Sequence, residues 1–167
     1  MATIERCLPK NGCATRRVWI EIGSMDTNNL PWSESDAFPD DVYPQQLLTR
    51  QIIAAAFAVF RALGFGFLES VYRRALAVEL QAMGIPVQQE VPYELFHRGV
   101  SIGYYRADLV VDSTVMVETK TGLVLDPFAR PQLLNCLGVA GLSLGLVLYF
   151  GPRGARVKRV VNSGRRP

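Results

Sequence analysis

Residues 101–120 read SIGYYRADLVVDSTVMVETK, and this stretch decides the fold. Apolar and polar residues alternate along both of its halves, which is typical of β-strands. A hairpin that places Val111 opposite Val115 would leave a three-residue loop between the two strands. In that register Asp108 lies directly opposite Glu118 on one face of the sheet, with Cβ atoms about 5 Å apart. The sequence therefore predicts a hairpin that brings two carboxylates together.

Two helices are expected before this hairpin. Apolar residues recur at helical spacing from Thr49, a candidate N-cap, to the glycines at 64–66, and again over about residues 67–83. Glu69 and Tyr72 lie one helical step apart at the start of the second helix, next to its apolar face. Two interpretations stay open for this pair. Glu69 either suits the helix N-terminus while Tyr72 belongs to the core, or both serve a functional site.

The elements around the hairpin predict a mixed sheet. A strand over residues 87–96 precedes the hairpin, and a helix over about 127–141 is followed by strands at 142–150 and 156–161. Pro131 is tolerable only in the first turn of that helix. Because a helix links the third strand to the fourth, the connection is a crossover. The expected fold is therefore α/β, with helices flanking a mixed central sheet.

The chain of 167 residues is long enough for one domain with tails. Residues 1–45 show no sustained hydrophobic period, so we expect an irregular or disordered segment there, a domain over 46–162 and a tail over 163–167. Residues 1–45 hold 4 basic and 7 acidic side chains, whereas the rest of the chain holds 14 basic and 8 acidic ones. A basic domain is what an anionic partner would require.

The densest basic cluster lies in and around the last predicted strand. Alternation along that strand places Arg156 and Lys158 on one face with Val160, and Arg159 on the other. The basic side chains could contact phosphates without sequence specificity, although a solvated edge strand accounts for them equally well.

We expect a cytoplasmic protein without a membrane partner. The run from Pro131 to Pro152 carries no charge over 22 residues, which is the length of a membrane span. It contains Asn135 and several glycines, however, and it divides into a helix and a strand that a protein core can bury. The three cysteines include no C-x-x-C spacing and indicate a reduced setting.

The candidate active site centres on Asp108, Glu118 and Lys120. Two carboxylates with an ammonium two residues on suit a hard divalent cation, Mg²⁺ or Mn²⁺, with Lys120 orienting a water or stabilising the charge of a transition state. Lysine is scarce here, at 3 residues against 15 arginines, so solubility does not explain Lys120. The alternative is an ion pair on a solvated sheet face, which contributes little to stability.

These pieces together resemble a known family, the GxxExxY proteins, a branch of the PD-(D/E)XK nuclease superfamily. The resemblance covers about residues 47–161 and rests on GFLESVY, YRADLVV, VMVETK, QLLNCL and GLVLYF. It implies a restriction-endonuclease-like αβββαβ core, a magnesium-dependent nuclease-like site and nucleic acid as the partner. Asp108, Glu118 and Glu69 would then face the metal. The catalytic roles implied by the resemblance fall on Glu69, Asp108, Glu118, Lys120 and Gln132.

The chain departs from that family at supporting positions. Phe60 stands where members often carry His, Cys136 where they often carry Tyr, and residues 129–131 lack a His-Glu pair. Three function classes therefore stay open: a metal-dependent nuclease acting on DNA or RNA, a catalytically silent nucleic-acid-binding module, and a protein-interaction scaffold on a nuclease fold. The sequence leaves the oligomeric state open, a homodimer included.

Overall fold

The computed structural model describes residues 3–4, 18–19 and 45–163. The prediction of an irregular segment over 1–45 falls outside the described residues, except for two short strands. These are β1 (Thr3–Ile4) and β2 (Val18–Trp19), which pair antiparallel and were not expected from the sequence. The C-terminal tail also lies outside the described residues, apart from its first residue.

The domain is built on a five-stranded sheet in the order β3-β4-β5-β6-β7. Among these strands, β5 and β6 pair in parallel and the other neighbours pair antiparallel, which confirms the predicted mixed sheet. The strands are β3 (Val87–His97), β4 (Val100–Val111), β5 (Val115–Thr121), β6 (Leu144–Gly151) and β7 (Gly154–Val161).

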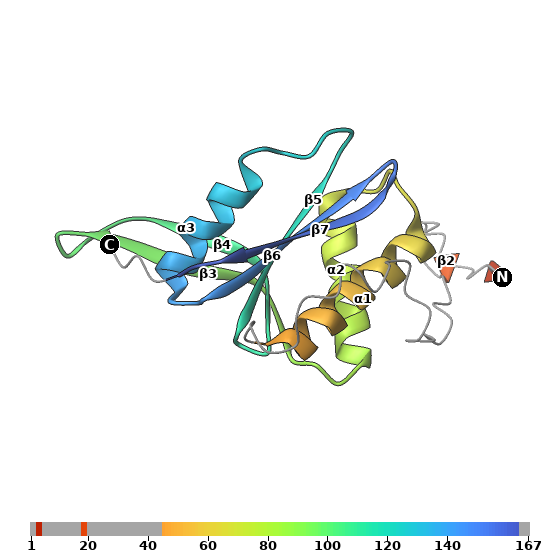
Figure 1. Ribbon diagram of the computed structural model, residues 1–167, viewed down its shortest axis with the longest axis horizontal. Coiled ribbons are helices and arrows are strands. Elements are labelled where there is room, and N and C mark those ends of the chain that lie inside the picture. Colours follow the sequence, from red (N-terminus) through yellow and green to blue (C-terminus); the bar gives the residue numbers. More distant parts are fainter. Residues whose placement is uncertain (1–2, 5–17, 20–44, 164–167) are drawn as a thin grey trace, which may run out of the picture.

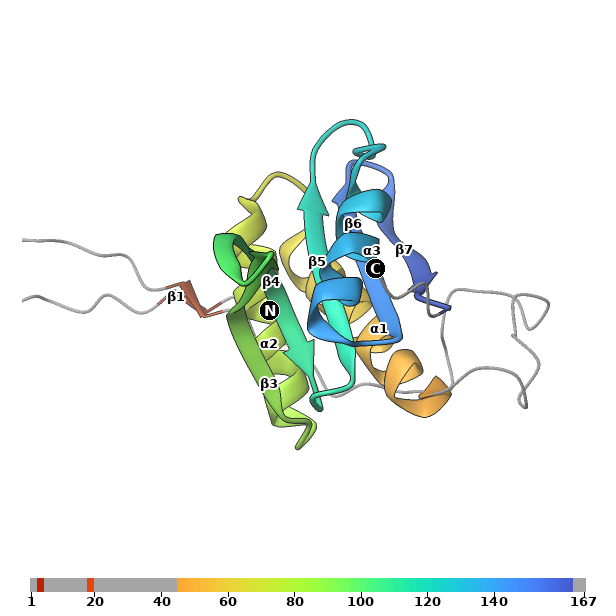
Figure 2. The same cartoon turned by 90° about the vertical axis from the view of Figure 1, so that its left-hand side faces the viewer.

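Helices cover both faces of the sheet (Figures 1 and 2). The first face is covered by α1 (Gln46–Leu63) and α2 (Glu69–Ala82), and α3 (Ala129–Ala140) lies on the other. Two separate clusters of buried side chains result. One joins α1 and α2 to residues such as Leu109 and Val117, and the other joins α3 to residues such as Val110 and Met116. Successive side chains of a strand point to opposite faces of the sheet, so each strand contributes to both clusters.

The first helix begins earlier than the sequence indicated. Gln45 adopts a left-handed conformation with φ 60°, and α1 starts at Gln46. Thr49 therefore lies within the first turn, buried, and its Oγ1 donates a hydrogen bond to the carbonyl of Gln45 at 2.9 Å. The prediction that Thr49 is the N-cap is wrong, because its hydroxyl bonds back along the helix instead of capping it.

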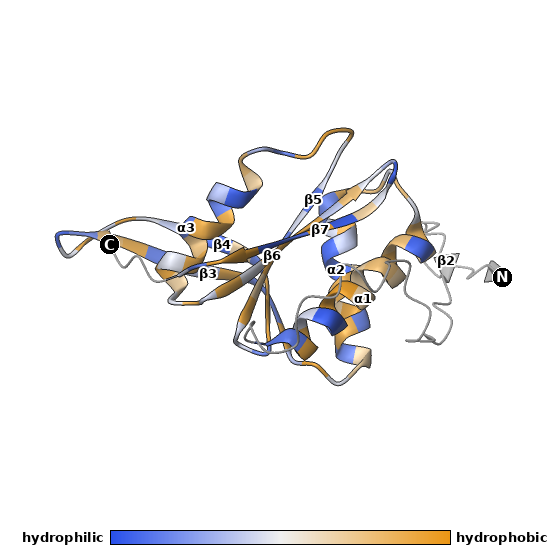
Figure 3. Cartoon of the chain, in the orientation of Figure 1, coloured by the Kyte–Doolittle hydropathy of each residue, from blue (hydrophilic) through white to orange (hydrophobic). Residues whose placement is uncertain are grey.

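By length and composition alone, α1 is apolar enough to cross a membrane. Figure 3 shows it coloured largely as apolar. Its side chains Ile52, Ala55 and Val59 are, however, completely buried in the cluster that α1 and α2 share with the sheet. Packing within the domain therefore accounts for the apolar residues of α1 that face the sheet.

The uncharged run between Pro131 and Pro152 divides as predicted, into α3 and β6. Every residue of β6 is buried. α3 approaches the strand closely at Gly145, where a Cβ would lie 2.9 Å from Cδ2 of Leu133. Glycine at this position lets helix and strand pack in direct contact.

Candidate active site

The site lies where β4 and β5 part. The two strands pair from Val111 opposite Val115 to Leu109 opposite Val117, which confirms the predicted register. Asp108 precedes Leu109 in β4, just beyond the last backbone pair. Here the Asp108 side chain, instead of the backbone, connects β4 to β5. Its Oδ2 accepts hydrogen bonds from the Thr119 backbone N–H at 2.8 Å and from Thr119 Oγ1 at 2.6 Å. A carboxylate thus bridges the point at which the strands diverge.

The regular alternation of faces breaks at Asp108. Ala107 and Val110 are three residues apart, yet both pack in the cluster under α3. On the neighbouring strand, Glu90 has φ 52°, a left-handed conformation in the middle of β3. The predicted shared face of Asp108 and Glu118 assumed unbroken alternation. Instead, the Asp108 carboxylate is turned toward Thr119 and toward α2.

A buried arginine on α2 holds the other side of this carboxylate. Arg73 is 9% exposed, and its guanidinium lies 3.4 Å from Asp108 Oδ1 and 3.1 Å from Glu90 Oε1. Burying a guanidinium is costly unless anionic partners accept its hydrogen bonds, and these two carboxylates serve that purpose. Arg73 therefore positions Asp108 from one side as Thr119 does from the other.

Glu118 and Lys120 form an ion pair on β5. Lys120 Nζ lies 2.7 Å from Glu118 Oε1, and their side chains are 18% and 13% exposed. Burial raises the pKa of Glu118, the Asp108 charge raises it further, and the hydrogen bond from Lys120 lowers it. Burial acts to lower the pKa of Lys120, but Glu118 and the nearby negative charges outweigh it and raise that pKa. Lys120 is therefore an ammonium at neutral pH.

Glu69 completes this charged cluster from α2, of which it is the first residue. Burial raises the pKa of its carboxyl, Lys120 lowers it, and the negative charge of Asp108 raises it again. The four polar residues predicted from the sequence thus act on one another electrostatically: Glu69, Asp108, Glu118 and Lys120.

The segment that leads into Glu69 is fixed by Tyr72. Tyr72 is completely buried, and its ring stacks on Phe150 with centroids 4.4 Å apart. Its hydroxyl donates to the Gly64 carbonyl at 2.7 Å and accepts a hydrogen bond from the Phe67 N–H at 3.3 Å. The interpretation of Tyr72 as a core residue is confirmed, and the same side chain sets the path of the loop before Glu69.

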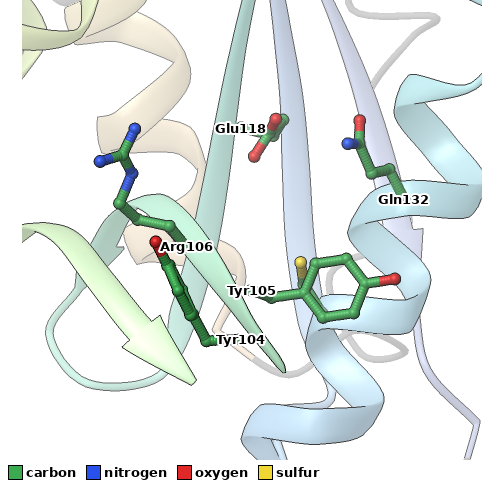
Figure 4. Close-up of a pocket in the computed structure, with 6 residues that line it drawn as sticks. Tyr104, Tyr105, Arg106, Glu118 and Gln132 are labelled. Atoms are coloured by element: carbon green, nitrogen blue, oxygen red, sulfur yellow. The ribbon is translucent and has the colours of Figure 1, made fainter. Parts of the chain in front are cut away.

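Gln132 lies across a pocket from Glu118 (Figure 4). The pocket has a volume of about 270 Å³, and its lining residues are Tyr104, Tyr105, Arg106, Glu118, Gln132 and Cys136. Cys136 is 4% exposed, as expected of a small core residue. Burial, with the charges of Glu118 and Asp108, raises the pKa of its thiol to about 11, so the thiol stays neutral.

The carboxylates do not form a complete metal site by themselves. Within residues 45–163, no three His, Cys, Asp or Glu side chains are grouped so that they could hold an ion. The donors nevertheless have the chemistry that a hard cation requires, because carboxylate oxygens bind Mg²⁺ and Mn²⁺. Burial and mutual repulsion raise the pKa values of Glu69 and Glu118, and a bound cation would offset both effects.

Sequence reasoning missed Arg73 and Thr119. Arg73 lies four residues after Glu69, and this spacing puts both on one side of α2. Thr119 lies between the two predicted site residues of β5, at the position where alternation predicts a buried side chain, and it is indeed completely buried. A polar side chain at a buried strand position needs a hydrogen-bond partner, and that requirement is the signal that could have found it.

The chain was compared with solved structures, curated proteins and family models. The crystal structure of SSO0001 is similar, with a TM-score of 0.47 and 17% identity over 59% of this chain. The chain spans about half the length of that protein, the match covering 52% of it. A search of curated proteins gave no match. A family model for the PD-(D/E)XK nuclease superfamily matches residues 46–160, which include all of the site and most of the chain. The chain therefore belongs to the PD-(D/E)XK nuclease superfamily.

Proposed function

We propose that this chain is a metal-dependent nuclease of the GxxExxY branch, and that it hydrolyses phosphodiester bonds in DNA or RNA. The observation that carries the proposal is the partly buried Glu118–Lys120 pair, with its oxygen and nitrogen 2.7 Å apart, beside the point where Asp108 bridges the diverging strands. Membership of the nuclease superfamily supports the reaction class.

Asp108 and Glu118 would hold the cation, with Glu69 beside them. The cation, when bound, lowers the pKa of a water molecule and withdraws charge from a phosphoryl oxygen. Lys120 supplies a fixed positive charge for the charge that develops on the phosphate, and its pairing with Glu118 keeps the ammonium in place. Hydrogen bonds from Arg73 and Thr119 hold the Asp108 carboxylate at the point where β4 and β5 diverge.

The sheet itself provides a basic path for an anionic strand. In the register of the sheet, Lys120 lies beside Tyr149, which in turn lies beside Arg156. One row below, Glu118 connects in the same way to Lys158. Arg156 and Lys158 are exposed, whereas Arg159 points to the opposite face, where it reaches Thr49. The basic side chains of Arg156 and Lys158 therefore face the same way as Glu118 and Lys120, which supports nucleic acid as the substrate.

A specific observation favours a second candidate, a catalytically silent nucleic-acid-binding module. Asp108 is already bonded to Thr119 and Arg73, and Glu118 to Lys120. A cation would compete with these internal partners for the same oxygens. In this candidate the basic face binds nucleic acid and the polar cluster serves only to hold the strands together.

Cleavage of labelled single-stranded and duplex DNA and RNA, with Mg²⁺, Mn²⁺ or EDTA, tests the proposal. We expect metal-dependent cleavage by the wild type and a loss of at least about a hundredfold for Asp108→Asn and Glu118→Gln, since groups at a developing charge contribute several kcal/mol. His97→Ala, at the exposed end of β3, is the control. Salt-sensitive binding without cleavage would favour the silent module. Absence of both binding and cleavage would leave the interaction scaffold.

A further inference from the structure

The pocket beside Glu118 combines aromatic, cationic and amide groups. β4 supplies Tyr104, Tyr105 and Arg106, α3 supplies Gln132 and Cys136, and Glu118 lies between them. Figure 4 shows Tyr104 and Arg106 on one side of the pocket and Gln132 on the other. Tyr104 is 71% exposed, so its ring is accessible to a ligand. No part of the mechanism above uses either tyrosine.

The lining has the composition of a nucleobase site. Tyrosine rings and arginine guanidinium planes stack on the faces of bases, and an amide offers two donors and an acceptor to a base edge. The Arg106 side chain is 61% exposed, and its one ion pair with residues that the structure describes is a 3.7 Å contact with Glu90, so it is available to a ligand. A volume of about 270 Å³ suits one ring system, since pockets for drug-sized ligands begin at roughly 300 Å³.

We propose that this pocket receives one unpaired nucleobase of a single strand, adjacent to the phosphate that the active site attacks. The inference rests on the proposed function, and it names the substrate class of that site. Within a duplex, base faces are stacked and base edges are paired, so a base reaches such a pocket only when it is unpaired or flipped out. Because Glu118 lines the pocket, a base held there lies next to the candidate metal ligands.

The test separates base recognition from backbone recognition. Fluorescence anisotropy in EDTA would measure binding of an oligothymidine strand roughly 15 nucleotides long, an abasic strand of equal length, the matching oligouridine strand and a duplex. We expect the wild type to bind the base-containing strand about 5- to 150-fold more tightly than the abasic one. Tyr104→Ala should remove this preference and leave abasic binding unchanged. Tyr104→Phe, which keeps the ring, should retain it.

Phe96→Ala is the matched control, because Phe96 is an exposed aromatic (62%) on β3, the strand next to β4, and does not line the pocket. It should keep the preference. Equal binding of base-containing and abasic strands by the wild type, no binding of either strand, or a preference that survives Tyr104→Ala would overturn the inference. Comparison of the oligouridine and oligothymidine strands shows whether the pocket prefers a base from RNA or from DNA. A base preference without metal-dependent cleavage would refute only the proposed function, and cleavage without a preference would refute only the pocket.

Discussion

Replacing Lys120 with methionine should destabilise the protein far more than the loss of a surface ion pair would. Methionine fills the volume of the lysine stem at little packing cost. It leaves Glu118 as a carboxylate that is 13% exposed, with Asp108 and Glu69 nearby and the hydrogen bond at 2.7 Å gone. Removing one partner of a buried pair costs about 3–5 kcal/mol, and the remaining water access at Glu118 reduces this to about 2–3 kcal/mol near pH 8.

The destabilisation should shrink as the pH falls. Burial and the neighbouring charges already raise the pKa of Glu118 from its ordinary value of 4.5, and loss of Lys120 raises it further. The native state of Lys120→Met then binds more protons than the unfolded state between pH 4.5 and that raised pKa. The contribution of Glu118 to the stability of this variant is therefore most favourable at low pH and falls as the pH rises through this window, at up to about 1.4 kcal/mol for each pH unit.

Urea unfolding of the wild type and Lys120→Met at pH 5 and pH 8 measures this directly. Lys158→Met is the matched control, an exposed lysine on the same sheet face that should change stability by about 0.5 kcal/mol or less. The double variant Glu118→Gln/Lys120→Met should recover most of the loss, because no unpaired charge remains. A pH-independent loss below about 1 kcal/mol would show that the pair is effectively solvated and would refute the reasoning.

Three further changes test the packing of the helices around the site. Tyr72→Phe removes the hydrogen bonds to Gly64 and Phe67 and should lower the free energy of unfolding by about 1–2 kcal/mol, measured in urea; an unchanged midpoint would show that the loop before Glu69 is held by other contacts. Gly145→Ala drives a methyl group against Leu133 and should cost about 1–3 kcal/mol by the same measurement. Gly138→Ala, in α3 with open space around it, should instead stabilise by about 0.5–1 kcal/mol.

The sequence was sufficient for the fold because each element carries its own period. The hairpin register, with Val111 opposite Val115, was proposed as one that would bring Asp108 beside Glu118, and the strands pair in that register. The crossover followed from a helical pattern between two apolar strands. These patterns are local in the sequence, so they can be recognised without knowledge of tertiary contacts. The start of α1 was missed because the left-handed conformation of Gln45 has no sequence signature comparable to a Ser or Thr cap.

The site was only partly predictable, because its geometry depends on contacts between residues far apart in the sequence. Alternation identified Glu118 and Lys120 as neighbours, and the structure pairs them. It could not give the orientation of Asp108, which depends on an irregularity at Glu90 and on Arg73, 35 residues earlier in the chain. The pocket lined by the tyrosines of β4 could not be predicted either. These tyrosines come close to Gln132 only through the tertiary packing of α3 on the sheet.

The left-handed Glu90 also affects how the sheet ends. Among the described residues β3 is an outermost strand of the sheet, and an outer edge of this kind could recruit a strand from another molecule. Along that edge Glu90 interrupts the regular row of backbone groups, and two residues later Pro92 has no N–H to donate. At the opposite edge of the sheet, β7 carries the exposed Arg156 and Lys158, whose charges oppose pairing with the same strand of another molecule. The conformation that lets Glu90 meet Arg73 thus also protects the domain against edge-to-edge aggregation.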